Sequence, residues 1–179
     1  MTVLAKEQIN INVNELKTIS NTDLADLCYN TEQAIKAGGG FGWISVPPRE
    51  VLKKYWNGIV LIKSNFLVVG RLNGSIAGAS QIAFNPPNNE AQKNISKIQT
   101  HFVVPWARGY GLAKAMIDLA IEISKENNMK SIQLDIRETQ SAAIQLFENK
   151  GFIKWGTNPS YAFINGSRIK GYYYYKDLQ

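Results

Sequence analysis

Hydrophobic side chains recur along the chain with either a two-residue period or a three-to-four-residue period, the spacings of a strand and of an amphipathic helix. Asn-Gly pairs at 73–74 and 165–166 are typical of hairpin turns. The expected elements, in chain order, are a strand at 9–16, a helix at 21–37, a helix that starts near 47–48, strands at 66–69, 75–84 and 95–104, a helix at 111–127, a strand at 132–136, a helix from 139 or 141 to 150, a strand that begins at 152–155 and a strand at 171–178. This order predicts one α/β domain over residues 1–179, with helices on both faces of a mixed sheet of about seven strands.

The segment from His101 to Met116 is predicted to join the central strand to the longest helix. Pro105 ends the strand because it has no N–H to donate to a sheet. A turn of sequence Arg-Gly-Tyr-Gly (108–111) then leads into apolar residues at helical spacing. The first turn of such a helix offers free N–H groups and the positive end of the helix dipole, and glycines let a bulky anion approach the backbone. The segment therefore favours an anion site to which Arg108 adds a guanidinium group, although the glycines could also serve the turn alone.

Two well-known phosphate-binding patterns do not fit this turn. A Walker loop needs Gly-Lys followed by Ser or Thr, whereas Gly111 is followed by Leu112 and Ala113. The dinucleotide fingerprint needs a third Gly or Ala three residues after the second, and that position is Lys114. The turn therefore matches neither the Walker loop of nucleoside-triphosphate-binding proteins nor the fingerprint of dinucleotide-binding proteins.

Period-two alternation assigns the polar residues of the predicted strands to faces. On the strand at 132–136, Asp135 faces away from the apolar row. In the closing strand, Tyr172 and Tyr174 share one face, Tyr173 and Tyr175 share the other, and one pair is expected in the core. The central strand is expected to place Ile98, Thr100, Phe102 and Val104 on one face, and Lys97, Gln99, His101 and Val103 on the other.

Composition narrows the class of protein. Apolar residues make up 45% of the chain and charged residues 19%, as in ordinary soluble globular proteins. No run is long enough to span a membrane and no signal peptide is evident, so we expect a cytoplasmic protein. A single cysteine, Cys28, excludes a disulfide framework and any multi-cysteine metal site. The formal charge of +6 comes from scattered Lys and Arg residues, and both a phosphate-rich coenzyme and nucleic acid are compatible with it.

Two motifs carry a family resemblance. The run Val-x-Pro-x-x-Arg-Gly-x-Gly-Leu-Ala (103–113) resembles the acetyl-CoA pyrophosphate loop of the GNAT acetyltransferase superfamily, and Ala-Ala-Ile-Gln-Leu-Phe-Glu-Asn-Lys-Gly-Phe (142–152) resembles its second landmark. The resemblance extends from about Leu24 to Leu178. A narrower likeness, to the bacterial subgroup that includes the tabtoxin-resistance acetyltransferase, rests on Gly39-Gly40-Phe41 with Pro47, Gly78 with Gln81, Leu134-Asp135, Tyr161, and Tyr174-Tyr175-Lys176-x-Leu178.

The resemblance implies a GNAT fold, in which the fourth and fifth strands separate to admit the coenzyme. It implies transfer of an acetyl group from acetyl-CoA to a primary amine of a small molecule or peptide, without a metal. The coenzyme-binding positions that it implies are Phe102, Val103, Val104, Arg108, Gly109, Tyr110, Gly111, Leu112, Ala113, Gln140, Ala143 and Phe147.

The chain departs from the family pattern at several positions. Trp106 stands where Gln or Arg is frequent, and Phe147 stands where many members have a tyrosine that protonates the leaving thiolate. A thiolate leaves readily because its free pKa is about 8.5, so the missing acid need not abolish transfer.

The family pattern does not identify a single catalytic base in this chain. The two positions that match the usual base are Lys97, which would need a strongly lowered pKa, and Gln99, which cannot accept a proton. The resemblance implies Asp135 as the first candidate base, because it matches an aspartate of the tabtoxin-resistance subgroup, and the single histidine, His101, is the second; each has the alternative of a structural polar residue. Tyr174 is the candidate hydroxyl in the pocket.

Two alternative functions stay open at this point. One is a catalytically weak acyl-CoA-binding protein, which the departures at Trp106, Phe147, Lys97 and Gln99 favour. The other is a basic nucleic-acid-binding domain, which the scattered positive charges disfavour. The identity of the amine acceptor does not follow from the fold or the coenzyme loop. The protein is expected to be a monomer or a homodimer, with no membrane partner.

Overall fold

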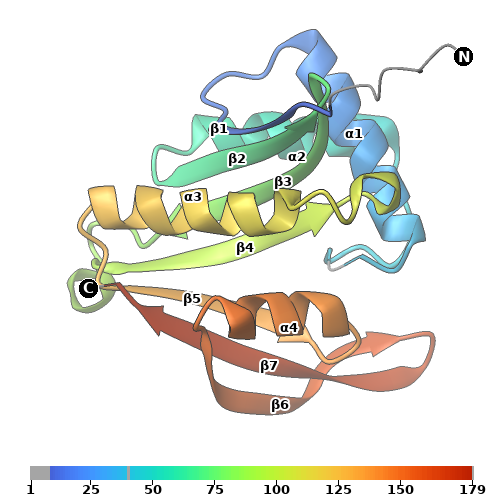
Figure 1. The fold of residues 1–179 in the computed structure, drawn as a ribbon. Coiled ribbons are helices and arrows are strands. Elements are labelled where there is room, and N and C mark those ends of the chain that lie inside the picture. The colour runs from blue at the N-terminus through green and yellow to red at the C-terminus, as the bar shows by residue number, and fades with distance from the viewer. Residues whose placement is uncertain (1–8, 40, 179) are drawn as a thin grey trace, which may run out of the picture.

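The computed structural model describes residues 9–39 and 41–178 (Figure 1). Its elements are β1 (Ile11–Glu15), α1 (Asn21–Lys36), α2 (Arg49–Leu61), β2 (Asn65–Leu72), β3 (Ser75–Phe84), β4 (Ile95–Val103), α3 (Leu112–Glu126), β5 (Ser131–Arg137), α4 (Ser141–Asn149), β6 (Ile153–Ile164) and β7 (Ser167–Asp177), with short 3-10 turns at Glu90–Gln92 and Pro105–Ala107. The predicted order of strands and helices is confirmed. The closing hairpin is longer than expected, because β6 runs to the Asn165-Gly166 turn and β7 starts directly after it. No helix in the described residues is long and apolar enough to cross a membrane.

The seven strands form one mixed sheet in the order β1-β2-β3-β4-β5-β7-β6. Neighbouring strands are antiparallel except for β4 and β5, which are parallel. Helices α1 and α2 cover one face of the sheet, here called the α1 face, and α3 and α4 cover the other, the α3 face (Figure 1). Each face has its own hydrophobic core, so the sheet lies between two apolar layers. The α/β fold class with helices on both faces is thereby confirmed.

Strands β4 and β5 separate halfway along their length. They pair only where Ile95–Ile98 lies beside Ser131–Leu134. Beyond this point Gln99 forms a bulge in β4, since Ile98 pairs with Ile82 on β3 while Thr100 pairs with the adjacent Gln81. A bulge bends its strand and increases the local twist, which turns the rest of β4 away from β5. The separation of strands that the family resemblance implied is thus present.

The bulge also reverses the alternation of side chains on β4, and the assignment of faces made from period two is wrong beyond Ile98. Ile98 packs in the core of the α3 face, but Phe102 packs in the core of the α1 face. His101 contacts Phe147 of α4 and therefore lies on the α3 face. Lys97 pairs in register with Ala83, one residue after Ile82, and lies on the α1 face. Lys97 and His101 consequently do not share a face.

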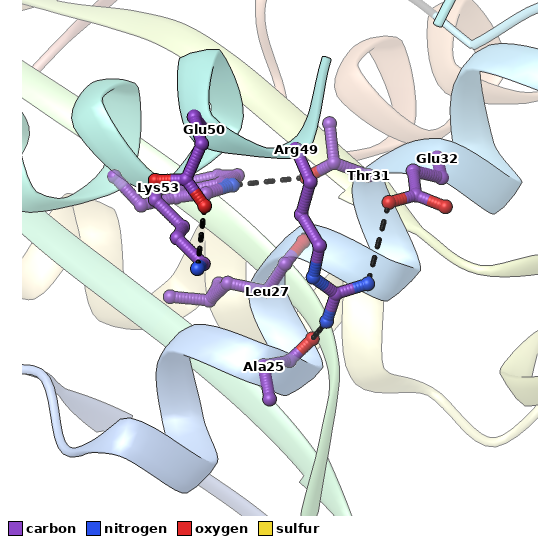
Figure 2. A network of polar contacts seen from close by, with 8 residues as sticks. Ala25, Leu27, Thr31, Glu32, Arg49, Glu50 and Lys53 are labelled. Atoms are coloured by element: carbon purple, nitrogen blue, oxygen red, sulfur yellow. Dashed lines mark hydrogen bonds and ion pairs between the residues drawn. The ribbon is translucent and has the colours of Figure 1, made fainter. Parts of the chain in front are cut away.

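Helices α1 and α2 are held together by a buried polar contact (Figure 2). The indole N–H of Trp56 donates to Thr31 Oγ1 at 3.0 Å, and the Thr31 hydroxyl donates to the carbonyl of Leu27 at 2.7 Å. On the surface of the same pair of helices, Arg49 forms an ion pair with Glu32 at 3.5 Å. These contacts join α1 to α2 on the α1 face of the sheet.

Candidate active site

A cavity of about 670 Å³ lies where β4 and β5 separate. Its walls come from both faces of the sheet: the end of α1 and the loop after it, the second half of β4, the start of α3, the start of α4, and the β6–β7 hairpin. The residues that line it are Ala34, Ile35, Ala37, Gly38, Gly39, Trp43, Ile44, His101, Phe102, Val103, Arg108, Ala113, Arg137, Thr139, Gln140, Ser141, Ala142, Ala143, Leu146, Ile164 and Ile169. A cavity that passes between two strands can receive one molecule from each face of the sheet.

The glycine turn lies at one end of this cavity. Gly109 and Gly111 have φ angles of 86° and 84°, in the left-handed region that favours glycine. Nothing lies within 4 Å of a Cβ built at either position, so glycine is needed for the backbone conformation and the space above the turn is open. Helix α3 begins at Leu112, and its first N–H groups have no partner within the helix. The turn can therefore bind an anion.

Arg108 extends from this turn toward the end of β4. Its side chain is exposed, and its Nε donates to the carbonyl of Val103 at 3.4 Å. Trp106, in the 3-10 turn just before it, has 51% of its surface exposed and is not among the residues that line the cavity. The guanidinium group of Arg108 adds positive charge beside the free N–H groups of the turn.

The structure divides the predicted coenzyme-binding residues into three groups. Six of them line the cavity: Phe102, Val103, Arg108, Ala113, Gln140 and Ala143. The exposed turn contains Gly109, Tyr110 and Gly111. The remaining three are buried in the core around the cavity: Val104, Leu112 and Phe147. The N–H of Val104 already donates to the carbonyl of Ala77 at 3.0 Å, so this group is not free to bind a ligand.

Part of the cavity wall was not predicted from the sequence. The end of α1 faces the segment between β5 and α4, and two side chains of that segment hold the loop after α1. The amide of Gln140 donates to the carbonyl of Gly38 at 2.8 Å, and the guanidinium of Arg137 donates to the carbonyl of Phe41. The apolar character of residues 41–44 was the one signal in the sequence, because apolar loop residues often line a pocket. Phe41 is buried in the core, whereas Trp43 and Ile44 line the cavity.

His101 lines the cavity from the α3 face. Both of its ring nitrogens are buried and lack a hydrogen-bond partner among the described residues. Its ring meets that of Phe147 edge to face, with centroids 5.5 Å apart. Burial lowers the pKa of His101 from 6.5 to about 4, because water no longer stabilises the charged form. The imidazole is therefore neutral near pH 7.

The lowered pKa of His101 predicts a pH-dependent loss of stability. Between pH 6.5 and about 4 the unfolded chain binds a proton at this position that the folded chain does not bind. The contribution of His101 to the free energy of unfolding should therefore decrease as the pH falls through this window. Urea denaturation at several pH values should show a steeper decrease for the wild type than for His101→Leu. Parallel curves for the two proteins would contradict the burial of a neutral imidazole.

Asp135 lies on the α1 face in a cluster with Lys97 and Tyr161. Lys97 Nζ is 2.5 Å from Asp135 Oδ1, and the Tyr161 hydroxyl donates to Asp135 Oδ2. Burial and this hydrogen bond raise the pKa of Tyr161 well above its usual value, so the hydroxyl stays protonated. The ring of Tyr161 lies against Gly171, where a Cβ would come within 2.1 Å of Tyr161 Cγ. A glycine at 171 is therefore required for the Tyr161 ring to lie there.

Tyr174 lies on the other face. Only 1% of its surface is exposed, and its hydroxyl donates to Glu148 of α4 at 2.8 Å. Burial, with this hydrogen bond, raises its pKa. Tyr174 packs in the core of the α3 face with Tyr172 beside it, as the alternation of the tyrosine run predicted, and it is not among the residues that line the cavity. Of the three candidate catalytic residues, His101 and Tyr174 thus lie on the α3 face and Asp135 lies on the α1 face.

A second cavity, of about 500 Å³, lies between α2 and β4. It contains Gln99 from the bulge, Gln81 from β3, and Tyr55 from α2. Tyr55 shares a hydrogen bond of 2.8 Å with Thr100, and its ring contacts that of Trp43, which lines the first cavity. The two cavities therefore share an aromatic wall on the α1 face.

Metal-ligating side chains do not gather at either cavity. Over residues 9–39 and 41–178, no group of three or more His, Cys, Asp or Glu side chains could hold a metal ion. Cys28 is buried in the core of the α1 face, and burial raises its pKa. The cavities thus offer amides, hydroxyls, one imidazole, two guanidinium groups and the ammonium group of Lys54.

Comparisons with known proteins agree with this geometry. The Acetyltransferase (GNAT) family profile matches residues 31–152. An N-acetyltransferase of unknown function, encoded in the hisH-hisA intergenic region of Azospirillum brasilense, is 42% identical over 130 residues, which are 73% of this chain and 77% of that protein.

Two solved structures share the fold. An N-acetyltransferase from Staphylococcus aureus Mu50 superimposes with a TM-score of 0.82 at 18% identity, over 95% of this chain and 99% of that one. The acetyltransferase yncA of Salmonella typhimurium, whose structure contains its cofactor acetyl-CoA, superimposes with a TM-score of 0.79 at 14% identity, over 95% of each chain. The profile match covers well over half of the chain, and the chain therefore belongs to the GNAT acetyltransferase family.

Proposed function

We propose that this protein transfers the acetyl group of acetyl-CoA to a primary amine of a small molecule or a peptide. The observation that carries the proposal is the cavity between the separated strands β4 and β5, with an open glycine turn at one end and the bulge at Gln99 in the strand that forms its wall. A long coenzyme with an anionic end fits such a cavity. The likeness to the tabtoxin-resistance subgroup and a cytoplasmic location remain predictions that accompany this proposal.

The residues present suit acetyl-CoA. Arg108 and Arg137 line the cavity, whereas none of the described lining residues carries a carboxylate. The pyrophosphate would bind at the free N–H groups that precede and open α3, where the φ angles of Gly109 and Gly111 keep the turn open. The edge of β4 beyond Ile98 has no β5 partner, so the backbone near Phe102 and Val103 is available to pair with the arm of the coenzyme.

The acceptor amine would approach from the α1 face, where Asp135 lies. In the reaction, the nitrogen of the free amine attacks the carbonyl carbon of the thioester, the carbon–sulfur bond breaks, and the sulfur leaves as a thiolate. The amine loses one proton, and Asp135 is the carboxylate that can accept it. The thiolate needs no proton donor to leave because the pKa of a free thiol is about 8.5, which suits a site with Phe147 in place of a tyrosine.

Coenzyme binding without efficient transfer is the second candidate function. Two observations favour it: Asp135 is already engaged by Lys97 and Tyr161, and the hydroxyl of Tyr174 is engaged by Glu148 away from the cavity. The two functions differ in their product. Release of free CoA thiol in the presence of amines measures transfer, whereas a thermal shift alone measures binding.

The first test of the proposal is a series of thermal melts with acetyl-CoA, CoA, ATP, NAD and a short nucleic acid at about millimolar concentration. A ligand at about 100 times its dissociation constant stabilises the folded state by roughly 2.7 kcal/mol, which a melt detects. We expect a shift with acetyl-CoA and CoA only. A panel of amines, assayed by thiol release, then tests transfer. A rise in melting temperature with nucleic acid alone would contradict the coenzyme site and would favour a basic nucleic-acid-binding domain.

The glycine turn provides a specific prediction for coenzyme binding. Gly111→Ala should weaken the binding of CoA about tenfold or more, because the alanine disfavours the φ of 84° that orients the N–H groups at the start of α3. Gly74→Ala is a matched control. Gly74 lies in the β2–β3 turn with a φ of 91°, and nothing lies within 4 Å of a Cβ built there. The Gly74→Ala variant should therefore lose a similar amount of stability and bind CoA normally. Equal CoA affinity in both variants, measured by calorimetry, would rule out the turn as the anion site.

A further inference from the structure

Two polar side chains beside the cavity lack a partner. Ser80 on β3 and His101 on β4 are directly opposite each other in the register of the two strands. Both lie on the α3 face, Ser80 because it pairs with Val68 of that core and His101 because it contacts Phe147. The bulge at Gln99 puts His101 there, since without it the imidazole would point to the α1 face.

The lack of partners concerns every polar atom of the two side chains. Ser80 is fully buried, and its Oγ has no hydrogen-bond partner among the described residues. Both ring nitrogens of His101 are likewise buried and unpaired in that part of the chain. Buried polar groups in native proteins are almost always hydrogen-bonded, and leaving them unpaired lowers stability. Three unpaired atoms on neighbouring residues therefore indicate a group that binds there.

His101 can both donate a hydrogen bond to a bound ligand group and accept one from it. The side chain of His101 lines the large cavity along with Phe102 and Val103. His101 precedes Val103 by two residues on β4, which at the rise per residue of a strand places it about 7 Å further from the glycine turn. Its position is therefore deeper in the cavity than the anion site. A neutral imidazole carries one N–H donor and one acceptor nitrogen, and a serine hydroxyl is both donor and acceptor. These groups match a neutral amide better than an anion.

We propose that His101 and Ser80 form a polar subsite for an amide of the pantetheine arm of acyl-CoA. In the complex, one ring nitrogen of His101 hydrogen-bonds the amide. The Ser80 hydroxyl, which is unpaired among the described residues of the free protein, then pairs with the other nitrogen and fixes the tautomer. The subsite rests on the proposed function, because it requires acyl-CoA in the cavity. In this arrangement His101 binds the coenzyme and does not take the proton of the amine, which approaches from the opposite face near Asp135.

The test compares CoA with adenosine 3′,5′-bisphosphate, which carries the nucleotide end but lacks the pantetheine arm. Calorimetry with the full-length chain should show that His101→Leu binds CoA about five- to tenfold more weakly than the wild type, as expected for a lost hydrogen bond, and binds the bisphosphate equally well. His101→Gln, which keeps an N–H donor, should recover part of the affinity. Ser80→Ala should show a smaller loss that is again confined to CoA.

Stability gives an independent readout with a matched control. Removing an unpaired buried group should not destabilise the protein, so the melting temperatures of ligand-free Ser80→Ala and His101→Leu at pH 7 should equal or exceed that of the wild type. Ser96→Ala is the control, because Ser96 is equally buried but its hydroxyl bonds Ser124 at 2.9 Å. Ser96→Ala should melt lower and bind CoA normally.

Three outcomes would overturn the subsite. Unchanged CoA affinity in His101→Leu would mean that the imidazole does not contact the arm. An equal loss for CoA and for the bisphosphate would mean that the substitution disturbs the whole cavity. Loss of turnover with unchanged CoA affinity would mean that His101 acts in proton transfer. Failure of the proposed coenzyme site is distinguishable from all three, because the wild type would then bind neither ligand. Failure of acetyl transfer alone would appear as absent thiol release with normal CoA binding, and it would leave the subsite intact.

Discussion

Asp135→Asn is expected to lower the turnover number for acetyl transfer by roughly 10²- to 10⁴-fold, the usual contribution of a positioned general base. The substitution keeps the shape of the side chain and the hydrogen bond from Tyr161, but it removes the group that can accept the proton of the amine. The affinity for CoA should stay within about twofold of the wild type, because Asp135 does not line the coenzyme cavity. Steady-state kinetics with a saturating amine, together with calorimetry, separate the two effects.

The surroundings of Asp135 provide graded controls for this prediction. Tyr161→Phe removes one hydrogen bond to the carboxylate and should lower the turnover number only several-fold. Asp118→Asn makes the same change of charge on α3, where the carboxylate pairs with Lys150 away from the cavity, and should leave turnover unchanged. A turnover number for Asp135→Asn within threefold of the wild type would show that Asp135 is a structural partner of Lys97. Coenzyme binding without efficient transfer would then gain support.

Trp56→Ala is expected to lower the free energy of unfolding by about 3–5 kcal/mol, the range measured for truncating large aromatic side chains in cores. Trp56 is fully buried in the core of the α1 face, where its ring contacts those of Tyr55 and Phe102. Its indole N–H also donates to Thr31, which joins α2 to α1 (Figure 2). Truncation leaves a cavity and removes that contact, so urea denaturation should show a much lower midpoint.

Two other tryptophan variants separate the contributions of the buried packing and of the hydrogen bond to the loss of stability expected for Trp56→Ala. Trp56→Phe keeps most of the apolar contact and removes only the N–H donor, so it should lose less stability than Trp56→Ala. Trp155→Ala removes a tryptophan that is 62% exposed on β6, and it should cost no more than about 1 kcal/mol. A loss below 1 kcal/mol for Trp56→Ala would contradict the tight packing of α1 and α2 on the sheet.

Local patterns were enough to predict most of the fold. The order of strands and helices, the two Asn-Gly hairpin turns and the glycine turn at 108–111 each depend on a few neighbouring residues. The division of the tyrosine run between the two faces also followed from period two, because β7 is regular there: Tyr174 is buried in the core of the α3 face and Tyr172 packs against that core. In the same way, the motif at 103–113 located the turn, and it contains half of the predicted coenzyme-binding residues that line the cavity.

The face of the sheet on which each site residue of β4 lies could not be predicted from local patterns. A single bulge at Gln99 reverses every later side chain of β4, and a bulge is a property of the pairing between β3 and β4. The sequence alone therefore placed His101 on the same face as Lys97, whereas the structure places it opposite Ser80 and against Phe147. Cross-strand pairing brings together side chains that are far apart in the chain, and no local pattern encodes that register.

The sequence by itself thus determined the elements, the family motif and the glycine turn, because backbone preference and side-chain period are local properties. Tertiary structure decided which polar groups meet. It joined Asp135 to Lys97 and Tyr161, left the ring nitrogens of His101 without a partner in the described part of the chain, and closed the cavity with contacts from Arg137 and Gln140. The physical reason is that the chemistry of this site depends on strand register and on the separation of β4 from β5, and both are fixed only when the whole sheet assembles.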